Sequence, residues 1–141
     1  MSTPTTVRRA AASTLLAVTL GASLVGVAGA PAQASGGDDD RVERTGSCTG
    51  PGVSEWKLTA KSDDGGVEVE GEVDSNRAGQ TWSWVIRQDG DLVARGTSTT
   101  RGPSGSFSVE RRARDAAGTD RFTFRATRGS SGEACAGSLR F

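Results

Sequence analysis

The stretch TWSWVIRQDGDLVARG, residues 81–96, decides the fold that this sequence predicts. Trp82, Trp84 and Ile86 alternate with smaller side chains, the period-two pattern of a strand with one buried face. Asp89-Gly90 then indicates a tight turn, because both residues tolerate the positive φ angles of a hairpin, and a second strand-like stretch follows. We expect at least one of the two tryptophans to lie in a core and the other to be partly exposed at the end of a sheet.

The same alternation recurs along the chain from residue 55 onward. Turn signals rich in Gly, Asp, Ser and Asn separate the apolar stretches, and no segment shows a helical period. About seven strands are predicted, at 55–61, 67–74, 81–87, 92–99, 106–111, 121–127 and 134–141. Short antiparallel strands at this spacing predict an all-β fold, a two-sheet sandwich.

Residues 1–34 have the anatomy of a secretory signal peptide. Arg8 and Arg9 precede an apolar stretch, no further charge occurs before Asp38, and the small residues of AQA (32–34) suit cleavage after Ala34. We therefore expect a secreted, extracellular protein with no membrane span after cleavage. The alternative is an uncleaved anchor, because the apolar stretch is nearly long enough to span a bilayer. The sequence leaves open whether export follows the general or the twin-arginine route.

The chain after residue 34 is long enough for one domain with one core. Without Arg8 and Arg9, 15 basic and 17 acidic residues remain, a net charge of −2. Residues 35–47 are polar, charged and rich in glycine, so we expect a flexible N-terminal segment there and a β-sandwich domain at 48–141.

The two cysteines, Cys48 and Cys135, are 87 positions apart in the sequence. An even count of cysteines in an exported protein predicts a disulfide, with two free thiols as the alternative. Cys48 precedes the first predicted strand and Cys135 lies on the last one. The bridge would therefore join the two ends of the domain.

The strand order, the tryptophan on the third strand and the corner DAAGTDRFTF (115–124) resemble an immunoglobulin-like sandwich. Two features depart from that pattern: the chain has no tyrosine to bind the corner, and its cysteines do not lie on the second and sixth strands. The alanine-rich start and the preference for Arg over Lys resemble small secreted actinobacterial proteins, of which the enediyne-binding apoproteins are a sandwich of this size. The resemblance is architectural and implies no particular activity.

Several chemistries lack the residues that they require. The sequence contains no histidine, which is the usual general base and the commonest zinc ligand, and its cysteines are expected to be bridged. A nucleotide cofactor site would need a glycine-rich motif followed by a helix, and the sequence contains no such motif. The acidic pairs Asp63-Asp64 and Asp89/Asp91 fall in predicted turns, where Asp is common for conformational reasons, and none matches a defined calcium loop. We expect no catalysis, cofactor or metal.

Charge is the one patterned surface feature. Residues 35–74 carry a net charge of −7, and residues 75–141 carry +5. On the second predicted strand the outward positions are acidic. On the third, sixth and seventh strands they include arginines, which would share one sheet in an immunoglobulin-like arrangement. These are Arg87, Arg121, Arg125 and Arg140, with Arg111, Arg112 and Arg114 forming a basic corner nearby. An ordinary solubilising surface is the alternative.

These observations predict a secreted, non-catalytic β-sandwich that serves as an extracellular or cell-wall-associated binding module. The expected partner is an anionic wall or extracellular polymer held by the arginines, without specific recognition of nucleic acid. One alternative is a secreted inhibitor or small-ligand carrier that uses the loops SNRAGQ (75–80) and RGPSG (101–105), or Trp82 and Trp84 as an aromatic contact beside a cleft. Another is a module that associates with itself, acidic face to basic face. The oligomeric state is left open.

Overall fold

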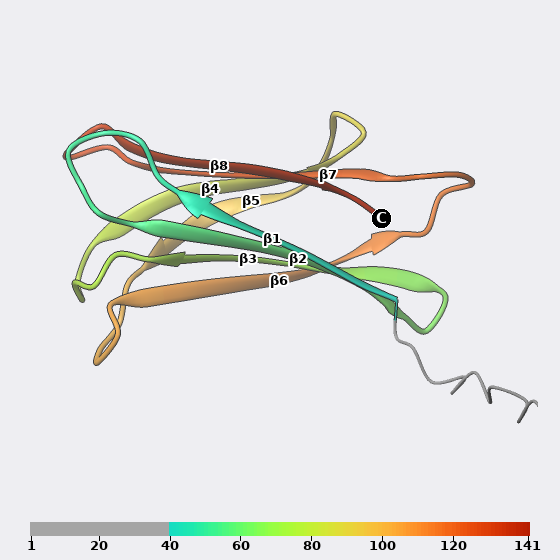
Figure 1. Cartoon of the computed structure of the whole chain (residues 1–141), viewed down its shortest axis with the longest axis horizontal. Helices are drawn as coiled ribbons and strands as arrows, with labels where there is room; N and C mark the ends of the chain where they lie inside the picture. Colours follow the sequence, from blue (N-terminus) through green and yellow to red (C-terminus); the bar gives the residue numbers. More distant parts are fainter. Residues whose placement is uncertain (1–39) are drawn as a thin grey trace, which may run out of the picture. The chain divides into compact units, whose positions relative to one another are not determined.

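The computed structural model describes residues 40–141, which form two packed antiparallel sheets (Figure 1). The predicted signal peptide and its cleavage after Ala34 lie outside the described residues. The strands are β1 (Arg41–Ser47), β2 (Glu55–Asp63), β3 (Gly66–Asp74), β4 (Thr81–Gln88), β5 (Asp91–Thr99), β6 (Ser106–Arg114), β7 (Arg121–Arg128) and β8 (Glu133–Arg140). The first sheet has the order β1-β2-β3-β6, and the second has β5-β4-β7-β8. The predicted all-β sandwich is confirmed.

The distribution of strands between the sheets also agrees with the sequence. The third, sixth and seventh predicted strands are β4, β7 and β8, and they lie together in the second sheet. The second predicted strand is β3, and it lies in the first sheet. Asp89 and Gly90 both have positive φ in the turn between β4 and β5, as the hairpin signal predicts.

The flexible segment predicted at 35–47 is wrong for residues 41–47, which form the additional strand β1. This strand pairs with β2 along its whole length, from Arg41 opposite Lys61 to Ser47 opposite Glu55. Its inward positions are Val42, Arg44 and Gly46, and only Val42 has an apolar side chain to pack against the core. The segment therefore lacks the apolar alternation by which the other strands were recognised. Residues 35–39 lie outside the described part of the chain.

The core lies between the sheets and contains both tryptophans of β4. Trp82 is fully buried and Trp84 is 5% exposed. The expectation that one of them would be partly exposed at a sheet end is wrong; Trp56 on β2 is the half-buried tryptophan. Phe122 and Phe124 of β7 and Phe107 of β6 are the other buried aromatic residues of the core.

Glycines on neighbouring strands leave the space in which the aromatic rings lie. A Cβ atom on Gly71 would come within 2.5 Å of the Phe124 ring, and one on Gly137 within 2.2 Å of the Trp56 ring. On β5, a Cβ at Gly96 would meet the Trp84 ring at 2.7 Å. Distances under about 3 Å are not tolerated between carbon atoms, so these rings require glycine beneath them.

A disulfide joins the two sheets at one side of the sandwich. Cys48 and Cys135 are bonded, as predicted. Beside the bridge, the Thr49 and Ala134 backbones exchange two hydrogen bonds of 2.7 and 2.8 Å. The buried carboxylate of Glu133 accepts a hydrogen bond of 3.2 Å from the Ser54 N–H and lies 3.4 Å from the Arg128 guanidinium. Together these contacts fasten the segment between β1 and β2 to the start of β8.

The corner before β7 is bound by a carboxylate in place of the absent tyrosine. Asp120 is buried, and its carboxylate accepts hydrogen bonds from the Gln88 side chain at 2.8 Å and the Ala116 N–H at 3.2 Å. The same Gln88 amide donates to the Arg114 carbonyl at 2.7 Å. A buried charge retained in this way requires its donors, so Asp120 has a structural role.

The contact between Gly71 and Phe124 can be tested by adding one methyl group. Gly71→Ala should lower the free energy of unfolding by about 1–3 kcal/mol, because overpacking forces the ring or the backbone to move. Gly129→Ala is the control, since a Cβ there meets nothing within 4 Å and the residue does not have positive φ. It should change stability by less than about 0.5 kcal/mol in urea unfolding. Equal effects would mean that the ring does not lie against Gly71.

Removal of the disulfide should destabilise the sandwich strongly. In the chain-entropy model, a bridge across a loop of this length contributes about 4–5 kcal/mol. The double variant Cys48→Ala/Cys135→Ala should therefore unfold at a much lower denaturant concentration. Its transition should coincide with that of the reduced wild-type protein. An oxidised wild type no more stable than either would show that the bridge carries no stability.

Candidate anion-binding surface

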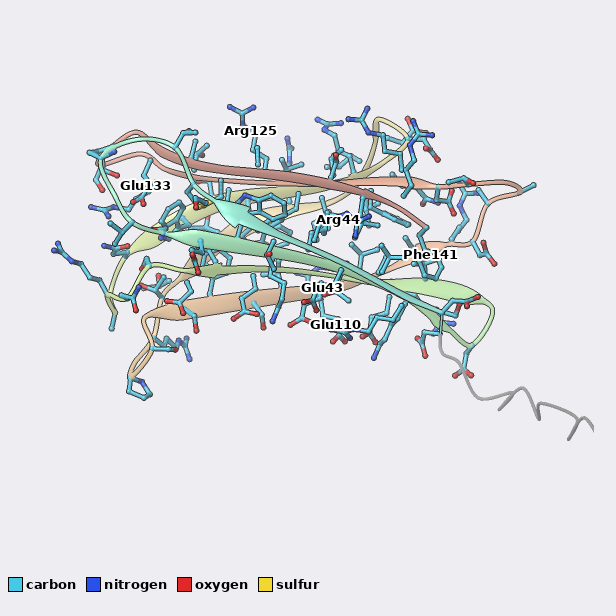
Figure 2. The ribbon with its side chains drawn as sticks, viewed as in Figure 1. Glu43, Arg44, Glu110, Arg125, Glu133 and Phe141 are labelled. Atoms are coloured by element: carbon cyan, nitrogen blue, oxygen red, sulfur yellow. A yellow bond between two sulfur atoms is a disulfide. The ribbon has the colours of Figure 1, made fainter. Side chains whose placement is uncertain are left out.

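The outward side of the second sheet carries positive charge only. Outward side chains alternate with buried ones along β4, β5, β7 and β8, and among them are five exposed arginines and no acidic residue. We call these five the arginine face: Arg87, Arg95, Arg121, Arg125 and Arg140. In Figure 2, Arg125 projects away from this layer, whereas Glu43 and Glu110 lie on the opposite side of the sandwich. The four arginines predicted from the sequence are thus brought together.

The register of the strands defines how the arginines are spaced. Val85 of β4 lies opposite Arg95 of β5 on one side and Arg125 of β7 on the other. Two strand spacings therefore separate these arginines, about 10 Å between their Cα atoms. Arg121 and Arg140 are direct cross-strand neighbours, an arrangement that is unfavourable for like charges. The fold thus holds positive charges close together without an acidic neighbour on that sheet face.

Two shallow hollows lie side by side on this surface. The first, of about 600 Å³, extends over β5, β4 and β7 and is bordered by Arg87, Arg95 and Arg125. The second, of about 370 Å³, extends over β4, β7 and β8 and is bordered by Arg87, Arg121 and Arg125. Small side chains line most of the remainder, and the buried residues Trp84 and Phe124 border the first and the second hollow, respectively. Arg87 and Arg125 therefore belong to both hollows, and Arg140 borders neither.

None of the five arginines forms an ion pair within residues 40–141. Arg87 donates one hydrogen bond of 2.9 Å to the Gly90 carbonyl in the adjacent turn. The nearby acid Asp89 is held by its own bond, since its carboxylate accepts from the Arg121 backbone N–H at 2.9 Å. The guanidinium groups therefore retain most of their donors for a ligand.

The outward side of the first sheet contains both signs of charge, with more acidic than basic residues. The acidic residues of β3 have basic neighbours on the flanking strands: Lys57 pairs with Glu72 at 2.5 Å, and Lys61 pairs with Glu68 at 2.7 Å. Hydrogen bonds to these carboxylates raise the pKa of both lysines above 10.5. These pairs neutralise part of the charge on this side, whereas Glu70 of β3 lies directly opposite Glu110 of β6.

The predicted basic corner on β6 is divided by the strand's alternation. Arg111 points inward and lies over the Trp84 ring, with 5.0 Å between its guanidinium carbon and the ring centroid, a cation–π contact. Arg112 binds the Asp63 carboxylate at 2.8 Å on the outer side. Two of the three arginines thus have partners within the domain, and the corner forms no single binding surface.

The two tryptophans proposed as an aromatic contact lie on the inner side of β4. The Trp84 indole N–H donates to the Ser98 hydroxyl at 3.0 Å, and Arg111 covers its ring. Trp82 is enclosed between the sheets. Neither ring is presented to solvent as a stacking surface.

Arg95 belongs to the arginine face but is absent from the sequence-based prediction. The strand LVARGTST was recognised, yet no outward side was assigned to it. Its alternation contains the signal, because Arg95 shares one side with Thr97 and Thr99. An irregularity between Ile86 and Arg87 shifts the pairing of β4 with β5, which makes that side hard to assign from the sequence.

The acidic turn residues act as turn residues in the structure. Asp64 and Asp89 have positive φ, and Asp63 accepts a hydrogen bond from Arg112. Within residues 40–141, no group of three potential ligands is placed to hold a metal ion. The same part of the chain contains no helix long and apolar enough to cross a membrane.

Comparison with known proteins finds no matching family model, no matching curated protein and no matching solved structure. The arginine face is therefore the basis for a proposal of function.

The ion pair between Arg41 and Glu43 on the first sheet predicts a low pKa for Glu43. The Arg41 guanidinium donates to this carboxylate at 2.9 Å and holds its pKa below the ordinary value of 4.5. Arg41→Gln should raise the Glu43 pKa toward 4.5 in an NMR titration. Arg44→Gln is the control, because Arg44 donates to the Glu43 carbonyl and not to its carboxylate. Because the pKa of Glu43 is lowered in the folded protein, any contribution of this pair to the free energy of unfolding is present above pH 4.5 and is lost as pH falls through the lowered pKa.

Proposed function

We propose that this protein is a secreted, non-catalytic binding module that attaches to an anionic polymer of the cell wall or the extracellular medium. The observation that carries the proposal is the arginine face: five arginines on one sheet surface with no acidic residue among the outward side chains. Guanidinium groups suit phosphate and carboxylate groups because they donate in a planar fork.

The overall charge of the chain makes this concentration of arginines informative. The whole sequence has 17 basic and 17 acidic residues. A protein that needed charge only for solubility could distribute both signs over both sheets, as the first sheet does. The first sheet also contains a like-charged cross-strand pair, Glu70 and Glu110, beside its ion pairs. The outward charges of the second sheet are all positive, and they include the direct neighbours Arg121 and Arg140. An anionic partner would remove the resulting repulsion.

The compartment agrees with this role. The Cys48–Cys135 disulfide indicates an oxidising environment, and residues 1–34 have the pattern of a signal peptide. Outside a bacterium, the abundant polyanions are wall phosphate polymers, acidic polysaccharides and free DNA. Secretion with cleavage after Ala34 is part of the proposal.

The alternative of an inhibitor or small-ligand carrier uses either the loops at 75–80 and 101–105 or a cleft beside the tryptophans, and only the second of these needs accessible tryptophans. Since Trp82 and Trp84 are both buried, support for the cleft is absent. The arginine face is open and shallow, which suits an extended polymer better than an enclosed small molecule.

Co-sedimentation with purified bacterial cell walls tests the proposal. The chain, with its disulfide formed, should sediment with walls at about 0.02 M salt and remain in solution at about 0.5 M, because the Debye length falls from about 20 Å to about 4 Å. Retention that is unaffected by salt would contradict an arginine-based contact. Absence of binding at both concentrations would leave the arginine face without this function.

A charge-reversal variant assigns the binding to the second sheet. Arg87→Glu/Arg121→Glu/Arg125→Glu should abolish retention at low salt. The matched control, Arg77→Glu/Arg101→Glu/Arg114→Glu, changes the net charge equally at exposed positions outside the arginine face. The control should retain most of its binding. Equal loss in both variants would attribute retention to net charge alone and contradict the proposal.

A further inference from the structure

The two hollows divide the arginine face into two three-arginine sites. Arg95 is specific to the first, Arg121 is specific to the second, and Arg87 and Arg125 border both. Hydroxyl groups supplement the guanidinium groups: Ser83, Thr97 and Thr127 in the first hollow, and Thr123 and Ser138 in the second.

Three arginines border each hollow and can be shared by one phosphodiester. Its charge lies on two non-bridging oxygens held out of one plane by the tetrahedral phosphorus, so guanidinium groups can approach each oxygen from different sides. A planar carboxylate is satisfied by a single arginine fork and gains less from a second and a third. The composition of each hollow therefore favours phosphate groups over carboxylates.

The lining of the hollows further limits the ligand. The outward positions of β4, β5, β7 and β8 hold Arg, Ser, Thr, Val, Ala and Leu. Trp84 and Phe124 border the hollows, but both are inward residues, 5% and 1% exposed, so neither offers a ring face on this surface. Proteins that bind single-stranded nucleic acid generally stack its bases on aromatic side chains. The face thus suits a slender chain whose linkers carry no aromatic group.

The separation of the hollows follows from the strand register. The first is centred on β4 near the row of Val85, and the second is centred on β7 about two residues further along. One strand spacing across and two residues along correspond to about 8 Å between the centres. Successive phosphates of an open-chain phosphodiester polymer can span such a distance.

We propose, on the basis of the proposed function, that the arginine face holds two successive phosphates of a polyol phosphate chain, one in each hollow. The chain lies diagonally across β4 and β7, with Arg87 and Arg125 between the two phosphates.

Short ligands of defined length test this arrangement. Glycerol phosphate oligomers with one, two and six phosphodiesters are titrated into the full chain, and binding is measured by calorimetry at low salt. Affinity should rise at least about tenfold from one phosphodiester to two, because the second binds intramolecularly. It should rise less for each phosphodiester beyond the second. Oligoglutamate, oligothymidylate and a sulfated oligosaccharide of matched charge should each bind at least about threefold more weakly.

Single substitutions separate the two hollows. Arg95→Gln and Arg121→Gln should each reduce the affinity for the two-phosphate ligand by about threefold to tenfold, and Arg125→Gln should reduce it more, because Arg125 borders both hollows. Arg140→Gln is the matched control. It removes the same charge from the same face but from neither hollow, and it should reduce affinity by less than about twofold.

The outcomes distinguish this inference from the proposed function. If Arg140→Gln costs as much as Arg125→Gln, or if all charge-matched polyanions bind equally, the face binds polyanions without two phosphate sites and the inference is overturned. Tighter binding of the carboxylate, sulfated or nucleic acid ligand would also overturn it. If neither the oligomers nor cell walls bind, the proposed function fails as well.

Discussion

The close packing of aromatic rings against glycines between the sheets is the constraint on which the rest of this structure depends. Phe124 lies against Gly71 of the opposite sheet, and Trp84 lies against Gly96 of the neighbouring strand. Because side chains alternate along a strand, these inward rings define which residues point outward. A slip of one residue in β4 or β7 would bury Arg87 or Arg125 and expose the rings. The arginine face is therefore the obligatory outer side of an aromatic core.

The fold does not itself require arginine at the outward positions. The first sheet shows what the same architecture does with ordinary surface charge, since Lys57 and Lys61 each pair with a carboxylate on β3. Threonine and serine occupy other outward positions of the second sheet and would satisfy strand propensity there. The crowding of one sign thus has a cost that packing does not explain. The proposed binding role would supply a reason for it.

The sequence predicted what depends on alternation, and it failed where alternation was weak. The strands and the outward direction of four arginines follow from period-two patterns, because burial of one strand face enforces the alternation. The disulfide follows from an even cysteine count in a protein expected to be exported. Strand β1 was missed because Arg44 and Gly46 occupy inward positions. Arg95 was missed next to an irregular pairing. The hollows depend on which strands are neighbours, and this tertiary information is not contained in any local pattern.

A rigid sheet would favour the proposed binding of a flexible polymer. The five arginines project from hydrogen-bonded strands, and the β8 edge of their sheet is fastened to the first sheet by the disulfide and by the Thr49–Ala134 pair. On such binding the polymer would lose conformational entropy, whereas the protein backbone would lose little because it is already ordered. Short, exposed ion pairs are individually weak, so attachment depends on several being made at once. A rigid sheet that presents arginines at fixed strand spacings provides this, whereas the same arginines on a disordered tail would have to be ordered by the ligand.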